Sequence, residues 1–255
     1  MRGPFLLVLL AVLTLPLMPL QKVFLWLGLD LGRVFPMYYH RIVCHLLGVR
    51  CEVIGAVPSS GPMLLVSNHV SWLDIVVLSS MAPVSFVAKR EVSSWPVFGT
   101  LARLQRTVFV DRTRRHAVGV SRDEMSERLE AGDTLVLFPE GTSSDGRRVL
   151  PFKTSFFASA GLPGVLVQPV SLAYRGHRNL PMNRRLLPSY AWYGEMALLP
   201  HLLAALNLGP IEVAIVFHSP LSLSGEKNRK QLAQHAENEV RRGLALALHD
   251  PGRIG

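Results

Sequence analysis

From Cys51 onward, short apolar segments alternate with longer stretches whose apolar residues recur at helical spacing. The short segments are rich in β-branched residues and bounded by Gly, Pro or Ser, which is typical of buried strands. They are CEVIGAV, PMLLVS, SFVAK, TVFVD, TLVLF, VLVQPVSL and, later, IEVAIVF. The stretches between and after them predict helices over Trp72–Met81, Ser93–Leu104, Arg115–Ala131, Thr154–Gly161 and Glu226–Leu248. This alternation favours an α/β fold with a mostly parallel central sheet flanked by helices.

The first part of the chain follows a different pattern. Pro4–Leu20 is a run of seventeen residues without a charge, at the short end of the roughly 17–25 residues that a membrane helix needs. A second apolar stretch, Val23–Leu31, follows it. Because no small-x-small cleavage site closes the first run, a retained anchor is favoured over a secretory signal peptide. We therefore predict an N-terminal membrane-associated helical segment over residues 1–32 and one α/β domain over residues 33–255.

The sequence allows two ways for this anchor to meet the bilayer. Pro16 and Pro19 disfavour one straight helix, and Asp30 adds a charge to the second stretch. A pair of helices that dips into one leaflet is therefore as consistent with the pattern as a full span. Only Arg2 lies upstream of the apolar run, whereas Arg33, Arg41 and Arg50 lie downstream. By the positive-inside rule, this predicts a domain on the cytoplasmic face of the inner membrane.

Composition agrees with a folded protein that contacts a membrane. Hydrophobic residues make up 49% of the 255-residue chain and charged residues 18%, below the roughly 25% of average soluble domains. Mean hydropathy is +0.29, so intrinsic disorder is excluded. The net charge of +9 suits a polyanionic partner, either nucleic acid or an anionic bilayer. Cys44 and Cys51 are too few for a disulfide scaffold or a tetrahedral zinc site, and we expect no metal.

One histidine stands at the end of a predicted strand. PMLLVS runs directly into Asn68 and His69, and Asp74 lies in the first turn of the helix that follows. In open α/β sheets, ligands bind at this edge. A strand-to-helix turn can bring the Asp74 carboxylate to one imidazole nitrogen, which leaves the other nitrogen to take a proton from a hydroxyl. The spacing alone is a weak signal, because a helix-capping aspartate near an unrelated histidine has the same pattern.

Three further motifs make the pattern specific. They follow the Asn68-His69 to Asp74 box in order, as Val108–Arg112, Phe138–Thr142 and Gln168–Val170. With these four motifs, residues 60–175 resemble the 1-acylglycerol-3-phosphate acyltransferases, a family of membrane-bound enzymes that acylate glycerolipids. The resemblance implies direct transfer of a fatty acyl group from a thioester, acyl-CoA or acyl carrier protein, to a lysolipid hydroxyl. It implies no covalent acyl-enzyme and no cofactor beyond this co-substrate.

The resemblance also supports roles for particular residues. It makes His69 the general base and Asp74 its orienting partner, within an acyltransferase domain over residues 33–255. It points to binding of the acceptor by five residues: Arg112, Glu140, Gly141, Thr142 and Lys153. An arginine suits a phosphate acceptor because its guanidinium can bind two phosphate oxygens at once.

Two features bear on the identity of the acceptor. Many family members carry an arginine directly after Phe-Pro-Glu-Gly-Thr, whereas this chain has Ser143. Either Arg147 or Arg148 substitutes for it, or the acceptor carries less phosphate charge. The aromatic and then apolar segment 190–203 is similar to a bacterial branch of the family that includes lyso-ornithine-lipid acyltransferases as well as phosphatidate-forming enzymes. We predict 1-acylglycerol-3-phosphate as the acceptor, giving phosphatidic acid, with lyso-ornithine lipid as the alternative.

Other classes of function lack their signatures. The sequence contains no Gly-x-Ser-x-Gly nucleophile elbow and no His-Glu-x-x-His zinc motif. A basic membrane-surface or nucleic-acid-binding protein is the non-enzymatic alternative, because pairs such as Arg184-Arg185 and Arg241-Arg242 can bind phosphates. The apolar N-terminus argues against nucleic acid. The predicted partners are therefore the lipid bilayer, the lysolipid acceptor and the acyl carrier.

Overall fold

The computed structural model describes residues 2–58, 61–110, 115–162, 164–222 and 228–249. Its centre is an eight-stranded sheet in the order β1-β8-β6-β2-β5-β3-β4, with the short β7 paired to the end of β6. The strands are β1 (Val49–Ile54), β2 (Met63–Ser67), β3 (Val84–Lys89), β4 (Val108–Val110), β5 (Thr134–Leu137), β6 (Leu166–His177), β7 (Leu180–Pro181) and β8 (Ile211–Phe217).

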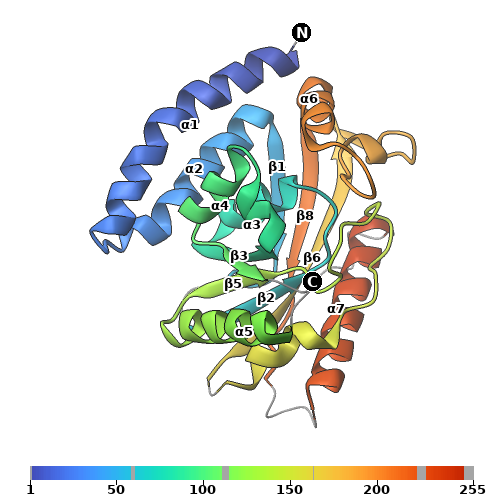
Figure 1. Cartoon of the computed structure of the whole chain (residues 1–255). Coiled ribbons are helices and arrows are strands. Elements are labelled where there is room, and N and C mark those ends of the chain that lie inside the picture. The colour runs from blue at the N-terminus through green and yellow to red at the C-terminus, as the bar shows by residue number, and fades with distance from the viewer. Residues whose placement is uncertain (1, 59–60, 111–114, 163, 223–227, 250–255) are drawn as a thin grey trace.

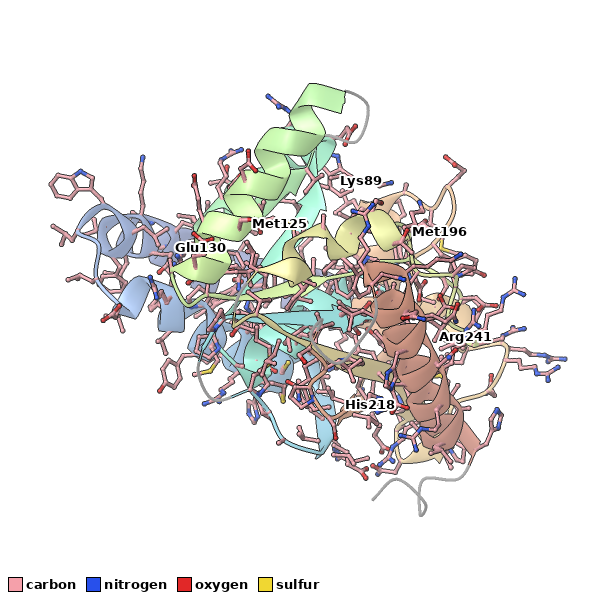
Figure 2. The ribbon with its side chains drawn as sticks, turned by 90° about the horizontal axis from the view of Figure 1, so that it is seen from below. Lys89, Met125, Glu130, Met196, His218 and Arg241 are labelled. Atoms are coloured by element: carbon pink, nitrogen blue, oxygen red, sulfur yellow. The ribbon has the colours of Figure 1, made fainter. Side chains whose placement is uncertain are left out.

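Helices cover both faces of the sheet (Figure 1). The core of one face includes side chains from α2 (Leu31–Leu47), α3 (Leu73–Met81) and α6 (Leu198–Leu208). The core of the other face includes side chains from α5 (Arg115–Glu130), the 3-10 helix η2 (Thr154–Gly161) and α7 (Arg229–His249). Figure 2 shows two of these second-face helices, α5 with Met125 and α7 with Arg241. Three further helices are η1 (Arg90–Ser94), α4 (Phe98–Leu104) and η3 (Leu187–Ser189).

The central strands are apolar on both sides because both faces of the sheet are covered. In β2, Met63 and Leu65 belong to the core of the first face, whereas Leu64 and Val66 belong to the core of the second. Such continuous apolar strands are typical of parallel sheets in α/β proteins. β2 is parallel to β5 and β6, β3 is parallel to β4 and β5, and β1 is parallel to β8. The predicted α/β fold with a mostly parallel sheet is confirmed.

One part of the sheet departs from parallel pairing. β6 and β8 are antiparallel neighbours, so β8 and its parallel partner β1 run against the other central strands. The connection from β6 to β8 includes α6 but is not a crossover between parallel strands, so β8 runs opposite to β6. As a result, the long strand β6 divides the sheet into two parts with opposite strand direction.

The N-terminal segment forms two helices. α1 (Arg2–Trp26) continues through Pro16 and Pro19, where the sequence disfavours one straight helix. Contacts with α2, α4 and α6 hold α1 along its length, and they outweigh the two missing backbone donors. Figure 1 shows α1 at the periphery, alongside α2. The predicted boundary at residue 32 falls inside α2, which begins at Leu31.

Two other predicted helices have a different form. The helix expected over Ser93–Leu104 is divided into η1 and α4, because Pro96 follows Trp95, whose backbone is extended as the residue before a proline prefers. Val97, which follows Pro96, has a positive φ of 62° and changes the direction of the chain before α4 begins. The segment Thr154–Gly161 is a 3-10 helix and not an α-helix.

Candidate active site

Two neighbouring parallel strands, β2 and β5, end at the same edge of the sheet. Val66 of β2 lies opposite Leu137 of β5. The chain continues from β2 into His69 and from β5 into Phe138 and Glu140, so the first and third predicted motifs meet at this edge. This is the edge at which α/β sheets bind their ligands.

His69 and Asp74 are in direct contact across the turn between β2 and α3. The His69 Nδ1 lies 2.7 Å from Asp74 Oδ2. The same carboxylate oxygen accepts hydrogen bonds from the backbone N–H groups of Val70, at 2.7 Å, and Ser71, at 2.9 Å. Asp74 is fully buried, whereas the His69 side chain keeps 19% of its surface exposed. The buried aspartate therefore holds one ring nitrogen, and the partly exposed ring faces the site where a substrate can reach it.

An aromatic ring holds the imidazole from one side. The Phe138 ring stacks on His69 with ring centroids 4.1 Å apart and an angle of 17° between the planes. The backbone of the same turn is also fixed, because the Ser144 N–H donates to the His69 carbonyl at 2.8 Å. We did not predict this role for Phe138, since a phenylalanine at a strand end has the pattern of an ordinary core residue. Stacking and backbone bonds together restrict the orientation of the His69 ring.

Asn68 has a structural position in the first motif. Its Nδ2 donates to the Leu172 carbonyl at 2.9 Å, and its Oδ1 accepts from the Leu172 N–H at 2.8 Å. The asparagine side chain thus continues the pairing of β2 with β6 beyond Ser67, the last residue of β2. This pairing holds the start of the His69 turn against β6.

Glu140 is a buried carboxyl at the same edge. It is only 3% exposed, and neither of its carboxylate oxygens has a hydrogen-bond partner among the residues that the structure describes. Burial raises the pKa of Glu140 to about 8; the backbone amides of His69 and Leu150 act against this shift, and the Asp74 charge acts with it. At pH 7 the side chain is therefore largely protonated in the absence of a ligand. A cation placed against it would favour the ionised form.

The other predicted binding residues lie around this turn, with one exception. Gly141 has a positive φ of 74°, and its N–H donates to the Phe138 carbonyl at 3.0 Å, so this amide helps to close the turn. Thr142 follows and is exposed. Lys153 is exposed and is held at the edge because its N–H donates to the Pro139 carbonyl at 2.9 Å. Arg112 lies outside the described residues.

The aromatic segment after η3 packs against the His69 turn. The backbone N–H of Trp192 donates to the Val70 carbonyl at 2.9 Å. The Trp192 ring is in edge-to-face contact with the Trp95 ring, with centroids 6.1 Å apart. Both tryptophans are partly exposed. The sequence marks this segment as aromatic, but nothing in the local pattern connects it with a motif more than 100 residues earlier. Trp192 is thus fixed next to the His69 turn, with the Trp95 ring packed against it.

A Ser–His–Glu cluster elsewhere in the fold has a structural role. Ser171 Oγ lies 2.8 Å from His218 Nε2, and His218 Nδ1 lies 3.5 Å from Glu239. The Ser171 hydroxyl donates to the Val240 carbonyl at 2.9 Å, and Ser171 is fully buried, so the serine is neither accessible nor deprotonated by the histidine. Figure 2 shows His218 beside α7. The cluster holds α7 against the sheet and does not form a hydrolase triad.

Comparison with known proteins shows the family of the chain. The family described as Acyltransferase matches residues 48–173. The chain is 47% identical to the lyso-ornithine lipid O-acyltransferase of Brucella abortus, over 92% of this chain and 91% of that protein. It is 44% identical to the lyso-ornithine lipid O-acyltransferase of Rhizobium meliloti, over 96% of this chain and 86% of that protein.

A solved structure supports the same assignment. The 1-acyl-sn-glycerophosphate acyltransferase of Thermotoga maritima has a TM-score of 0.62 and 26% sequence identity, covering 83% of this chain and 77% of that one. The resemblance predicted from the four motifs is therefore confirmed. This chain belongs to the acyltransferase family.

Proposed function

We propose that this chain is a membrane-associated O-acyltransferase that transfers a fatty acyl group from a thioester to a hydroxyl group of a lysolipid. The observation that carries this proposal is the contact of 2.7 Å between His69 Nδ1 and the buried Asp74 carboxylate. It lies at the ligand-binding edge of a sheet in a chain of the acyltransferase family.

The chemistry follows from which imidazole nitrogen is held. With Nδ1 bonded to Asp74, the other nitrogen, Nε2, removes the proton from the acceptor hydroxyl while its oxygen attacks the thioester carbonyl carbon. The new C–O bond forms and the C–S bond breaks. His69 passes the proton to the departing sulfur, and Asp74 stabilises the imidazolium in between. The products are the acylated lipid and the free thiol of the carrier, coenzyme A or acyl carrier protein.

We propose lyso-ornithine lipid as the preferred acceptor. Two lyso-ornithine lipid O-acyltransferases are 47% and 44% identical to this chain, and the chain covers at least 86% of the length of each. Ser143, in place of the arginine that many family members carry, agrees with an acceptor without a phosphate. The unpartnered carboxyl of Glu140 also suits the ornithine ammonium. 1-Acylglycerol-3-phosphate, favoured by the motifs, stays compatible with the likeness to the Thermotoga maritima enzyme.

A competition assay tests the acceptor. Purified enzyme receives lyso-ornithine lipid and 1-acylglycerol-3-phosphate at equal concentration with one radiolabelled acyl thioester, in parallel reactions with acyl-CoA and acyl carrier protein. We expect ornithine lipid to exceed phosphatidic acid by roughly tenfold or more, because the two head groups differ in charged groups and not only in size. Glu140→Gln is expected to reduce this preference. A predominance of phosphatidic acid in the wild-type reaction would contradict the proposed acceptor.

We further propose that α1 and α2 lie in one leaflet of the bilayer. α1 is long and apolar enough to cross a membrane, with 11% of its most apolar window buried against the protein. Both of its ends are bonded to the same folded domain. Near the start, the Gly3 N–H donates to Asn207 Oδ1 at 2.7 Å; near the end, Gln21 Nε2 donates to the Leu104 carbonyl at 2.9 Å. A helix held in this way fits the interface better than a perpendicular span.

The outward face of α1 supports this arrangement. Its exposed apolar residues recur at spacings of three and four, which places them on one side of the helix: Phe5, Val8, Val12 and Leu15. The last residue of α1 adds the most exposed of these side chains, Trp26, at 81%. Tryptophan favours the headgroup level of a bilayer. The basic residues that follow the anchor support a position of the domain on the cytoplasmic face.

Membrane attachment can be tested with charges on this face. The triple variant Val8→Asp, Val12→Asp, Leu15→Asp is expected to leave most of the protein in the soluble fraction, because each aspartate costs several kcal/mol in the apolar layer. Wild-type protein should stay on membranes in high salt, which removes purely electrostatic binders. Activity of the variant in detergent micelles controls for folding. A folded, active variant that sediments with membranes as wild type does would refute the arrangement.

A further inference from the structure

Tyr174 lies beside the candidate dyad although it is 100 residues away from Asp74 along the chain. β6 is twelve residues long and pairs with β2 only as far as Ser67, opposite Val170. Its continuation carries Tyr174 to the turn between β2 and α3. There the Tyr174 hydroxyl donates to Asp74 Oδ1 at 2.6 Å. The tyrosine is 1% exposed and packs in the core of the first face.

The two oxygens of Asp74 have different partners. Oδ2 contacts His69 Nδ1 and accepts from the backbone N–H groups of Val70 and Ser71. Oδ1 accepts from Tyr174, which is the one hydrogen-bond partner of this oxygen in the part of the chain that the structure describes. Without the tyrosine hydroxyl, Oδ1 would be a fully buried charged oxygen with no donor, and only the bonds to Oδ2 would hold the carboxylate.

The surroundings keep Tyr174 a donor. Burial, and next the Asp74 charge, raise the pKa of Tyr174 well above its usual value, so its hydroxyl stays protonated throughout the physiological range. Negative charge on Cys44 of α2 or Cys51 of β1 would raise the pKa of Tyr174 in the same direction. Glu140, at the end of β5, lies close enough to Asp74 for their charges to interact.

We propose that Tyr174 is a positioning residue for acyl transfer, the third member of a buried Tyr174–Asp74–His69 relay. Its hydroxyl holds the carboxylate so that Oδ2 faces the imidazole. It also withdraws negative charge toward Oδ1, so the proton stays on His69 Nδ1 and does not pass to the carboxylate. The proposal rests on the proposed function, because it requires His69 to act as the base.

The relay has a consequence for the dependence of the rate on pH. A carboxylate that loses the tyrosine bond concentrates its charge at the imidazole and stabilises the imidazolium. The imidazolium cannot accept a proton from the acceptor, so the base becomes active only at higher pH. A purely structural tyrosine would change stability and leave the pH profile unchanged.

The test is Tyr174→Phe, which keeps the buried ring and removes only the hydroxyl. For the purified full-length enzyme with its lysolipid acceptor, we expect kcat to fall roughly tenfold, with little change in KM for the acceptor. We expect the acidic limb of the kcat/KM profile to move up by about one pH unit. Wild-type kcat and an unshifted limb in the folded variant would overturn the relay.

Tyr190→Phe is the matched control. Tyr190 is also a buried tyrosine, and its hydroxyl donates to the Gly209 carbonyl at 3.2 Å, away from Asp74. This variant should keep the wild-type kcat and pH profile. If wild-type enzyme itself transfers no acyl group, the proposed function fails; if wild type is active and Tyr174→Phe matches the Tyr190→Phe control, only the relay fails.

A second replacement covers the case in which Tyr174→Phe does not fold. Incorporation of 3-fluorotyrosine at position 174 keeps the hydroxyl and makes it a stronger donor. The acidic limb is then expected to move to lower pH, opposite to the shift for phenylalanine. No shift, or a shift in the same direction as for phenylalanine, would contradict the relay.

Discussion

Replacing His69 with alanine is expected to lower kcat for acyl transfer by about 10²–10⁴-fold. In the proposed mechanism the imidazole takes the proton from the acceptor, and alanine removes this base. Stability should change little, because His69 is partly exposed and the ring that stacks on it, Phe138, keeps its contact with Phe86. The measurement is the initial rate of radiolabelled acyl transfer by purified enzyme at saturating acceptor.

A matched histidine distinguishes chemistry from general effects. His45 on α2 is exposed and lies outside the candidate site, so His45→Ala should keep the wild-type rate. Circular dichroism and a thermal melt establish that both variants are folded. A folded His69→Ala enzyme with wild-type kcat would show that another group is the base and would contradict the proposed mechanism.

The second large effect is expected for Asp74→Asn, with a fall in kcat of about 10²–10⁴-fold. An asparagine can present its amide nitrogen to His69 Nδ1, which then becomes the acceptor and leaves the proton on Nε2, the wrong nitrogen for a base. The charge that stabilises the imidazolium is also lost. Because Asp74 Oδ2 accepts two backbone bonds, the variant is further expected to lose about 1–3 kcal/mol of stability.

Rate and stability must therefore be measured on the same preparation. The assay temperature is chosen well below the melting midpoint of Asp74→Asn, so that loss of folded enzyme does not enter the rate. Asp30→Asn serves as the control, since Asp30 is exposed and forms no side-chain cap of α2. Retention of full activity by folded Asp74→Asn would mean that the contact of 2.7 Å with His69 is structural.

Much of the fold could be predicted from local pattern. Strands β2, β3 and β5 appear in the sequence as short apolar runs bounded by turn residues, because both of their faces are buried between helices. The ends of these strands identify the edge of the sheet that holds the site. The position of His69 after β2 and of Asp74 in the next helix could also be predicted, since both lie within a single turn of the chain.

Other features depend on partners that are distant in the sequence. No local pattern shows that β8 runs antiparallel to β6, because the periodicity of a strand is the same in either direction. The path of α1 past Pro16 and Pro19 is determined by its contacts with α2, α4 and α6. Helix propensity takes no account of these contacts. It therefore predicts a break in the helix at the two prolines, whereas α1 is continuous.

The sequence by itself determined the α/β class, the edge that holds the site and the His69–Asp74 pair, because each depends on residues that are neighbours along the chain. Only the tertiary structure decided what surrounds this pair: the Phe138 ring and the Glu140 carboxyl, which follow β5, and the Tyr174 hydroxyl from β6. These groups come from β5 and β6 and not from β2, so their distances to His69 and Asp74 follow from strand order and register. Strand order and register result from packing across the whole sheet, which no short segment of sequence encodes.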